Sequence, residues 1–149
     1  MLRNRNLFPL SHQHQHGLAL CVRVRRGLAK QNVDEQTLVR FRRELRDFYA
    51  LEGGAHLAAE EELVFPAADR FEELRPLTAC LRGEHAELRN RFAQSESAGH
   101  EEMLATAELL TRHIRTEENE LFERMQQLMS ADELAAIGRG LERTIGWVG

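Results

Sequence analysis

Two stretches of the chain repeat one arrangement of potential metal ligands. Residues 56–66 read HLAAEEELVFP, and residues 113–123 read HIRTEENELFE. Each stretch places a glutamate four residues after a histidine, a spacing that brings two side chains to the same face of a helix. A carboxylate buried on an apolar helix face is costly unless it has a partner. The repetition therefore indicates a shared chemical purpose, such as binding a cation.

Histidines elsewhere in the chain extend this pattern. His85 lies on the apolar stripe of its own predicted helix. Near the N-terminus residues 12–16 read HQHQH, so three histidines compete for one inward position. A projection at about 100° per residue places the apolar stripe of that segment close to His14 and turns His12 and His16 away from it. We therefore predict that His14 is the inward histidine of this helix.

Together these residues form a candidate ligand set. One inward histidine is more often a hydrogen-bonded core residue than a metal ligand. Four such histidines with two buried carboxylates favour metal binding, because an uncompensated buried carboxylate is costly. A metal-free interaction bundle is the alternative. The predicted metal ligands are His14, His56, Glu60, His85, His113 and Glu117.

Several acidic residues lie close to this set in the sequence. Glu61 and Glu62 project away from the ligand direction, which is typical of solvated charges. Glu118 projects only slightly further round than Glu117, so the choice between them stays open. Glu52 projects inward one turn before the histidine of its helix, where it would be either an additional ligand or a support for one.

Apolar residues recur at steps of three and four, and no segment alternates with period two, so the sequence predicts helices and no strands. Ser11 is a candidate N-cap for the first helix. Pro66 is expected to end the second helix, in which Gly53 and Gly54 mark a kink or a close approach. His100 is placed in an exposed loop. The predicted long helices run from just after Pro9 to about residues 27–30, over 34–65, from Pro76 to 93, and over 101–129.

A short fifth helix is predicted at the C-terminal end, opened by the capping-box pattern Ser130-x-x-Glu133. Four long helices with short connections pack most simply as an up-down-up-down antiparallel bundle. The predicted fold class is therefore all-α, a four-helix bundle with a short C-terminal fifth helix. A chain of 149 residues is expected to form one domain over residues 1–149.

Composition excludes several classes of function. A net charge of -4 gives no basic surface for nucleic acid. No run approaches the roughly 20 apolar residues that span a bilayer, and the N-terminal segment has no apolar core typical of a secretion signal. Two isolated cysteines, Cys21 and Cys80, are typical of reduced thiols in a cytoplasmic protein. We therefore expect a cytoplasmic protein with no nucleic-acid or membrane partner.

The donor set narrows the choice of metal. Imidazole and carboxylate without thiolate favour iron, manganese or zinc over copper(I) or an iron–sulfur cluster. Two octahedral ions offer about twelve coordination positions. Four histidines, two bridging carboxylates and one bridging oxo or hydroxo group fill about ten of them. The remaining positions would be open to water, dioxygen, nitric oxide or peroxide.

The order of these motifs resembles the hemerythrin-like HHE cation-binding domains. The chain has His14 within HQHQHGL, then HLAAEEELVFP, then EHAEL at residues 84–88, and HIRTEE at residues 113–118. The similarity covers the chain from about Leu7 to Met129. It implies a four-helix bundle that holds a non-haem centre of two iron ions, with the histidines as terminal ligands and Glu60 and Glu117 as bridges.

Two departures from the oxygen-carrying hemerythrins bear on function. Those proteins have a second histidine one turn after the third-helix ligand, where this chain has Arg89. They also use an aspartate five residues after the last histidine, where this chain has Glu118, with Glu117 at four. An open position and a nearby guanidinium suit an iron centre that reacts with its ligand rather than storing it.

We therefore expect a di-iron protein that binds or senses dioxygen, nitric oxide or peroxide. The resemblance also allows an iron-handling or iron-centre repair protein, or a peroxide-consuming di-iron enzyme. An enzyme is the less favoured class, because the sequence shows no dedicated general acid or base beyond the ligands.

Overall fold

The computed structural model describes residues 1–146, so the last three residues of the domain predicted over 1–149 lie outside the described part. The described residues form helices joined by short connections and contain no β-strand, which confirms the all-α prediction. No helix within them is long and apolar enough to cross a bilayer. The α-helices are α1 (Phe8–Gly27), α2 (Glu35–Phe48), α3 (Gly54–Ala59), α4 (Phe65–Asp69), α5 (Arg75–Ala93), α6 (His100–Thr116), α7 (Phe122–Leu128) and α8 (Ala131–Thr144).

Short turns of other helical types connect or interrupt these helices. π-helical turns, in which the backbone bonds from residue i to i+5, cover Tyr49–Gly53, Glu60–Val64 and Glu117–Leu121. They join α2 to α3, α3 to α4 and α6 to α7, so each of these runs continues as one long helical segment. Turns of 3₁₀ helix cover Arg5–Leu7, Glu72–Leu74 and Ser95–Ser97.

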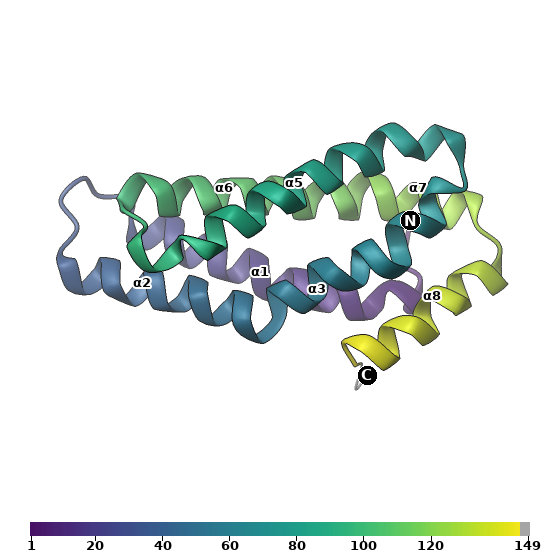
Figure 1. Cartoon of the computed structure of the whole chain (residues 1–149), viewed down its shortest axis with the longest axis horizontal. Coiled ribbons are helices and arrows are strands. Elements are labelled where there is room, and N and C mark those ends of the chain that lie inside the picture. The colour runs from purple at the N-terminus through teal and green to yellow at the C-terminus, as the bar shows by residue number, and fades with distance from the viewer. Residues whose placement is uncertain (147–149) are drawn as a thin grey trace.

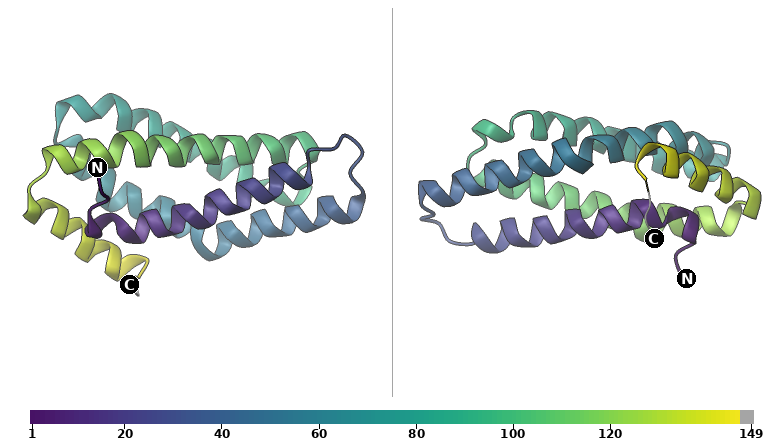
Figure 2. Two further views of the ribbon diagram at one scale, coloured as in Figure 1. Left: turned by 180° about the vertical axis from the view of Figure 1, so that it is seen from behind. Right: turned by 90° about the horizontal axis from the view of Figure 1, so that it is seen from below.

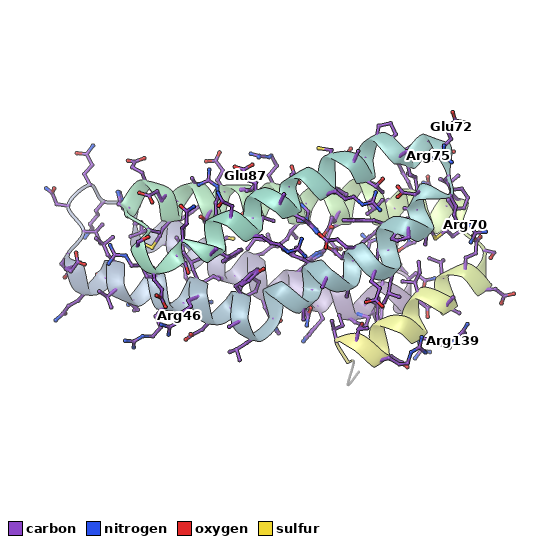
Figure 3. All side chains as sticks on the ribbon, in the orientation of Figure 1. Arg46, Arg70, Glu72, Arg75, Glu87 and Arg139 are labelled. Atoms are coloured by element: carbon purple, nitrogen blue, oxygen red, sulfur yellow. The ribbon has the colours of Figure 1, made fainter. Side chains whose placement is uncertain are left out.

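The long helical segments lie side by side along the long axis of the molecule (Figure 1). α6 packs against both α1 and α5, and α4 also packs against α5. α8 lies at one end of the molecule, close to the N-terminus (Figure 2), where it packs against the 3₁₀ turn Arg5–Leu7. Labelled charged side chains such as Arg46 and Glu87 point away from the helices (Figure 3). The buried side chains of the described residues are mostly apolar, and the buried polar ones are the six predicted ligands with Thr78, Ser95, Thr106 and Thr111.

The first helix begins earlier than the sequence suggested. α1 starts at Phe8 with Pro9 in its first turn, where the missing amide hydrogen costs nothing. The N-cap is Leu7, which makes no side-chain cap, so the prediction of Ser11 as N-cap is wrong. Ser11 lies inside the helix, and its hydroxyl donates a hydrogen bond to Glu118 at 2.7 Å.

Pro66 does not end the second long segment, which continues to Asp69. The wide turn Glu60–Val64 precedes it, and Pro66 lies in the first turn of α4, where an amide hydrogen would have no partner within that helix. The π-helical turn Tyr49–Gly53 ends at Gly53. The sequence therefore located an irregularity at Gly53 and Gly54 without giving its type.

Other boundary predictions fare better. Pro76 lies in the first turn of α5, and Ser130 and Glu133 form the predicted capping box of α8.

His100, predicted in an exposed loop, is instead the first residue of α6 and is partly buried. Its Nε2 donates to the carbonyl oxygen of Leu28 at 2.6 Å, which ties the start of α6 to the end of α1.

The hydrophobic core consists of two clusters of buried side chains, one toward each end of the molecule. On α1, Leu10 belongs to one cluster and Leu20 to the other. On α5, Leu81 belongs to the same cluster as Leu10, and Leu88 belongs to the same cluster as Leu20. The predicted histidines of these helices lie between the paired leucines. Two apolar regions therefore enclose a polar layer across the middle of the fold.

Candidate metal centre

The structure brings all six predicted ligands together in this polar layer. The histidines come from α1, α3, α5 and α6, and the glutamates are the first residues of two π-helical turns. None of the six is more than 7% exposed. Their ligand atoms form two groups that could each hold a cation, and both groups contain the same two glutamates. We call these six residues the buried centre: His14, His56, Glu60, His85, His113 and Glu117.

The four histidines of the buried centre form two pairs. In the first pair, the Nε2 atoms of His14 and His56 lie 3.1 Å apart. In the second pair, the Nε2 atoms of His85 and His113 also lie 3.1 Å apart. Each pair joins two helices, and the four Nε2 atoms face inward.

The two carboxylates connect the pairs. Glu60 places Oε2 3.3 Å from His56 Nε2 and Oε1 3.1 Å from His85 Nε2. Glu117 places Oε1 2.9 Å from His14 Nε2 and Oε2 3.3 Å from His113 Nε2. Each carboxylate thus presents one oxygen to each histidine pair. This is the arrangement that two bridging carboxylates need in a centre of two metal ions.

The local backbone helps to position these carboxylates. Glu60 and Glu117 each begin a π-helical turn, and π-bulges occur frequently at functional sites. A wide turn changes the direction of the residues that follow it relative to a regular α-helix. The backbone therefore departs from α-helical geometry at the two glutamates that contact both histidine pairs.

Each histidine of the buried centre also has an acceptor for its outer ring nitrogen. A carboxylate or amide oxygen next to Nδ1 makes that nitrogen the donor, so the Nε2 lone pair of a neutral ring faces the centre. This tautomer and orientation are those that bind a metal through Nε2. The acceptors are Glu118 for His14 at 2.6 Å, Gln13 for His56 at 2.9 Å, Glu61 for His85 at 2.9 Å and Glu84 for His113 at 2.8 Å.

Two of these acceptors correct or complete sequence predictions. Glu61, predicted as a solvated charge, instead accepts from His85 and also binds Arg89 through both oxygens, at 2.6 and 2.8 Å. Arg89 was expected near the metal ligand, but its guanidinium is engaged with Glu61. Glu118 accepts from His14, whereas Glu117 faces the centre, and the role of Glu117 as a ligand stays a prediction. Glu62 is exposed as predicted.

Glu52 does not join the buried centre. Both its oxygens lie 2.9 Å from Nδ1 of His16, a histidine on the outer side of α1. Gln13 and Glu84 are contacts that the sequence reasoning missed. Glu84 directly precedes a predicted ligand, and the doubled glutamate in both HxxxEE motifs was the available signal that a second carboxylate supports a histidine of another helix.

The pKa shifts of the buried residues show how strongly their charges interact when no cation is bound. Burial raises the pKa of Glu60 well above its usual range, and the negative charge of Glu117 raises it further. Burial is the largest single influence and works against ionised Glu117, but the neighbouring His113, His14 and His85 together outweigh it and hold the pKa of Glu117 well below its usual range. Burial lowers the pKa of His113, yet Glu117 and Glu84 more than offset this and raise it to about 9.

Three buried carboxylate oxygens have no hydrogen-bond partner among the described residues, namely Oε2 of Glu60 and both oxygens of Glu117. Their nearest neighbours are imidazole Nε2 atoms, which carry lone pairs in the neutral rings that bind a metal and donate only when a ring is protonated, as the raised pKa of His113 favours without a metal. Unpartnered buried carboxylate oxygens are costly, and a cation satisfies them together with the inward lone pairs. The donor set therefore fits a metal centre.

A small cavity of about 20 Å³ lies beside three histidines of the centre, His14, His56 and His113. This volume is room for about one water-sized molecule. The cavity lies on the side of the centre nearer α2. Its apolar walls come from Phe48, Leu57, Phe92, Leu110 and Ile114.

An all-helical protein with two histidine pairs joined by shared carboxylates belongs to the class of helical metal-binding proteins. The family model described as the hemerythrin HHE cation binding domain matches residues 8–125. The chain therefore belongs to the hemerythrin HHE family, as its motifs indicated. No match was found among curated proteins or among solved structures.

The acceptors of the outer ring nitrogens give a first test of the centre. Because supporting hydrogen bonds of this kind typically contribute 10- to 100-fold to metal affinity, Glu84→Ala should weaken cation binding by about that factor. Glu84→Gln should weaken it less, since its amide oxygen still accepts from His113, as Gln13 does for His56. Competition with a chelator of known affinity measures both effects.

Glu87→Ala is the matched control, since Glu87 is exposed on the same helix and its carboxylate binds Arg91 instead of a histidine of the buried centre. Equal cation affinity in Glu84→Ala and Glu87→Ala would show that Glu84 does not support the centre.

Proposed function

We propose that the buried centre binds two iron ions in an antiparallel, up-down-up-down four-helix bundle, with Glu60 and Glu117 as the bridging ligands. The observation behind this proposal is that each carboxylate presents one oxygen to each histidine pair, with oxygen-to-Nε2 distances of 2.9 to 3.3 Å. A site for one cation would need its donors around one point. Here the donors surround two points that share the same two carboxylates.

Imidazole and carboxylate donors with no thiolate fit iron, manganese or zinc, and the resemblance to the hemerythrin-like domains favours iron among these three. Cys21 belongs to an apolar cluster, and Cys80 is exposed on α5, so neither contributes a sulfur ligand. A bound iron pair of this kind supplies coordination and redox chemistry toward dioxygen, nitric oxide or peroxide.

The protein's own contribution is to bind such a small ligand selectively. The cavity beside the centre has room for about one water-sized molecule, and most of its walls are apolar. Apolar walls favour a small, weakly polar ligand over a charged one and limit the water that can enter with it. We therefore propose that the protein binds or senses a diatomic molecule or peroxide.

Metal content and spectroscopy test this proposal. Protein produced with iron should contain about two iron ions per chain, as the paired ligand set requires. It should show near-ultraviolet charge-transfer absorption and magnetically coupled iron in Mössbauer spectra, and both signals should change when nitric oxide is added. Protein that binds only one ion, or two uncoupled ions, would contradict the bridged pair. Unchanged spectra with nitric oxide, dioxygen and peroxide would contradict ligand binding.

Cation binding should weaken as the pH falls below about 9. In metal-free protein His113 has a pKa of about 9, raised from 6.5, so its ring is protonated at pH 7. Burial and the charge of Glu117 raise the pKa of Glu60, which favours its protonated form as well. Metal ligands must be deprotonated, so loading the centre at pH 7 releases protons. Titration with a divalent cation in a weakly buffered indicator solution should show this release, and its absence would contradict the role of both residues as ligands.

A further inference from the structure

A few side chains separate the small cavity beside the buried centre from solvent. Among the residues that line this cavity, Gln13, Phe48 and Glu52 also line depressions of the outer surface. Protein interiors are close-packed, so a ligand can pass from such a depression into the cavity only where a side chain moves aside. Each of these three residues is therefore a candidate for the point of entry.

Polar contacts hold two of the three candidates in place. Gln13 places Oε1 2.9 Å from Nδ1 of His56, and both oxygens of Glu52 lie 2.9 Å from Nδ1 of His16. Moving either side chain breaks a contact with a histidine, which for Gln13 is a residue of the buried centre. The side chain of Phe48 has no polar atom, so its displacement breaks no hydrogen bond. Phe48 is therefore the candidate that moves most easily.

Phe48 lies in a slot between two helical segments. It is the last residue of α2, directly before the π-helical turn Tyr49–Gly53, and its side chain is partly exposed. A Cβ atom at Gly17 of α1 would lie 3.4 Å from Cζ of Phe48, and a Cβ atom at Gly53 would lie 3.0 Å from its Cε2. Two glycines thus leave just enough room for the ring between α1 and the π-helical turn.

The ring of Phe48 has different surroundings on its two sides. On the inner side it contacts Phe92, another wall of the cavity, with ring centroids 6.1 Å apart. On the outer side it borders a surface depression of about 360 Å³, which Leu20 and Leu51 also line. The depression can accept the ring, and its apolar residues would still cover part of the ring there. A rotation of Phe48 outward would leave a passage into the cavity.

We propose that Phe48 is the gate through which a diatomic molecule or peroxide enters the cavity beside the buried centre. This inference rests on the proposed function, because it assigns the entry route of the proposed ligand. With the ring in its slot the cavity is closed on this side, and the ligands of the buried centre stay shielded from bulk water. Rotation of the ring into the outer depression opens the route, so the frequency of this rotation sets the rates of ligand entry and exit.

Stopped-flow measurements on iron-loaded protein test the gate with nitric oxide as the probe. Phe48→Ala should raise the association and dissociation rates by the same factor, about tenfold, because a gate alters the barrier equally in both directions. The dissociation constant should therefore change little. Leu110→Ala is the matched control, since Leu110 lines the same cavity and is only 6% exposed. It enlarges the cavity without opening this route, so its association rate should stay near that of wild type.

Two outcomes of these measurements would overturn the gate. The first is an equal association rate in wild type and Phe48→Ala. The second is an equal acceleration in Phe48→Ala and Leu110→Ala, which would make cavity size, and not the position of Phe48, the cause.

Motion of the ring in metal-free wild-type protein provides a test that does not depend on iron. Relaxation dispersion at a carbon-13-labelled Cζ of Phe48 should show exchange between two positions on a microsecond to millisecond time scale. Cζ lies on the ring axis, so simple ring flips do not contribute to this signal. Phe41 is the control, since it lies fully buried on the same helix and should show no such exchange.

The two tests separate the gate from the proposed function. A single rigid position of Phe48 would overturn the gate, even in a protein that binds two iron ions and nitric oxide. If the buried centre does not bind iron, nitric oxide will leave the spectra of all variants unchanged. The exchange at Phe48 would still decide in that case whether the ring opens the cavity.

Discussion

Glu60→Gln should abolish the coupled iron pair while the helices remain folded. The two oxygens of Glu60 face different histidine pairs, at 3.3 Å and 3.1 Å. Glutamine keeps one oxygen and replaces the other with an NH₂ group, which has no lone pair to offer a cation. One of the two ions then loses a bridging ligand. We expect iron content to fall from about two ions per chain to about one, and Mössbauer spectra to lose the coupled signal.

The metal-free form of the same variant should be at least as stable as metal-free wild type. Burial and the charge of Glu117 raise the pKa of Glu60 well above its usual range in the absence of metal, which favours the neutral carboxyl that glutamine resembles. Metal-free Glu60→Gln should therefore melt at or above the temperature of metal-free wild type, whereas with iron it should melt below loaded wild type. Glu62→Gln is the control, because Glu62 is exposed on the same segment. Coupled iron in Glu60→Gln would remove Glu60 from the bridging role.

Helical spacing was sufficient to predict which residues face the interior. A histidine followed four residues later by a glutamate lies on one helix face whatever the neighbouring helices do. The apolar stripe around His14 also selected one of three adjacent histidines correctly for its direction. The structure places all six residues in one buried group, and their role as iron ligands stays a prediction.

The supporting contacts could not be predicted in the same way. Glu61 appeared to be a solvated charge because its own helix turns it away from the ligand face. Its partners, His85 and Arg89, lie on α5, so its role depends on how two helices are placed against each other. The same holds for Glu84, whose partner His113 lies on α6. A single-helix projection contains no information about contacts between helices.

The π-helical turns also escaped prediction, and they explain the error at Pro66. Local propensity does not distinguish a wide turn from a regular one, because the difference depends on what surrounds the turn. Once the turn Glu60–Val64 is present, Pro66 falls in the first turn of a new α-helical segment and is tolerated there. The segment therefore continues to Asp69 instead of ending at the proline.

Removing the metal should lower the melting temperature by about 16–32 °C. A cation that binds only the folded state stabilises it by about 4 kcal/mol at a free concentration 1,000 times its dissociation constant. Two ions double this effect, and 1 kcal/mol corresponds to about 2–4 °C for a chain of this size. Without metal, the unpartnered oxygens of Glu60 and Glu117 remain buried between the two apolar clusters.

Thermal melts with and without a chelator measure this effect, and the double variant His85→Ala/His113→Ala provides the control. That variant lacks one histidine pair, so a chelator should change its melting temperature much less than that of wild type. Hydrogen exchange should locate the loss of stability in the π-helical turns Glu60–Val64 and Glu117–Leu121, because these turns begin with the two proposed bridging ligands. An identical melting temperature for loaded and metal-free wild type would mean that the metal adds nothing to the fold. The buried carboxylates would then need another source of compensation.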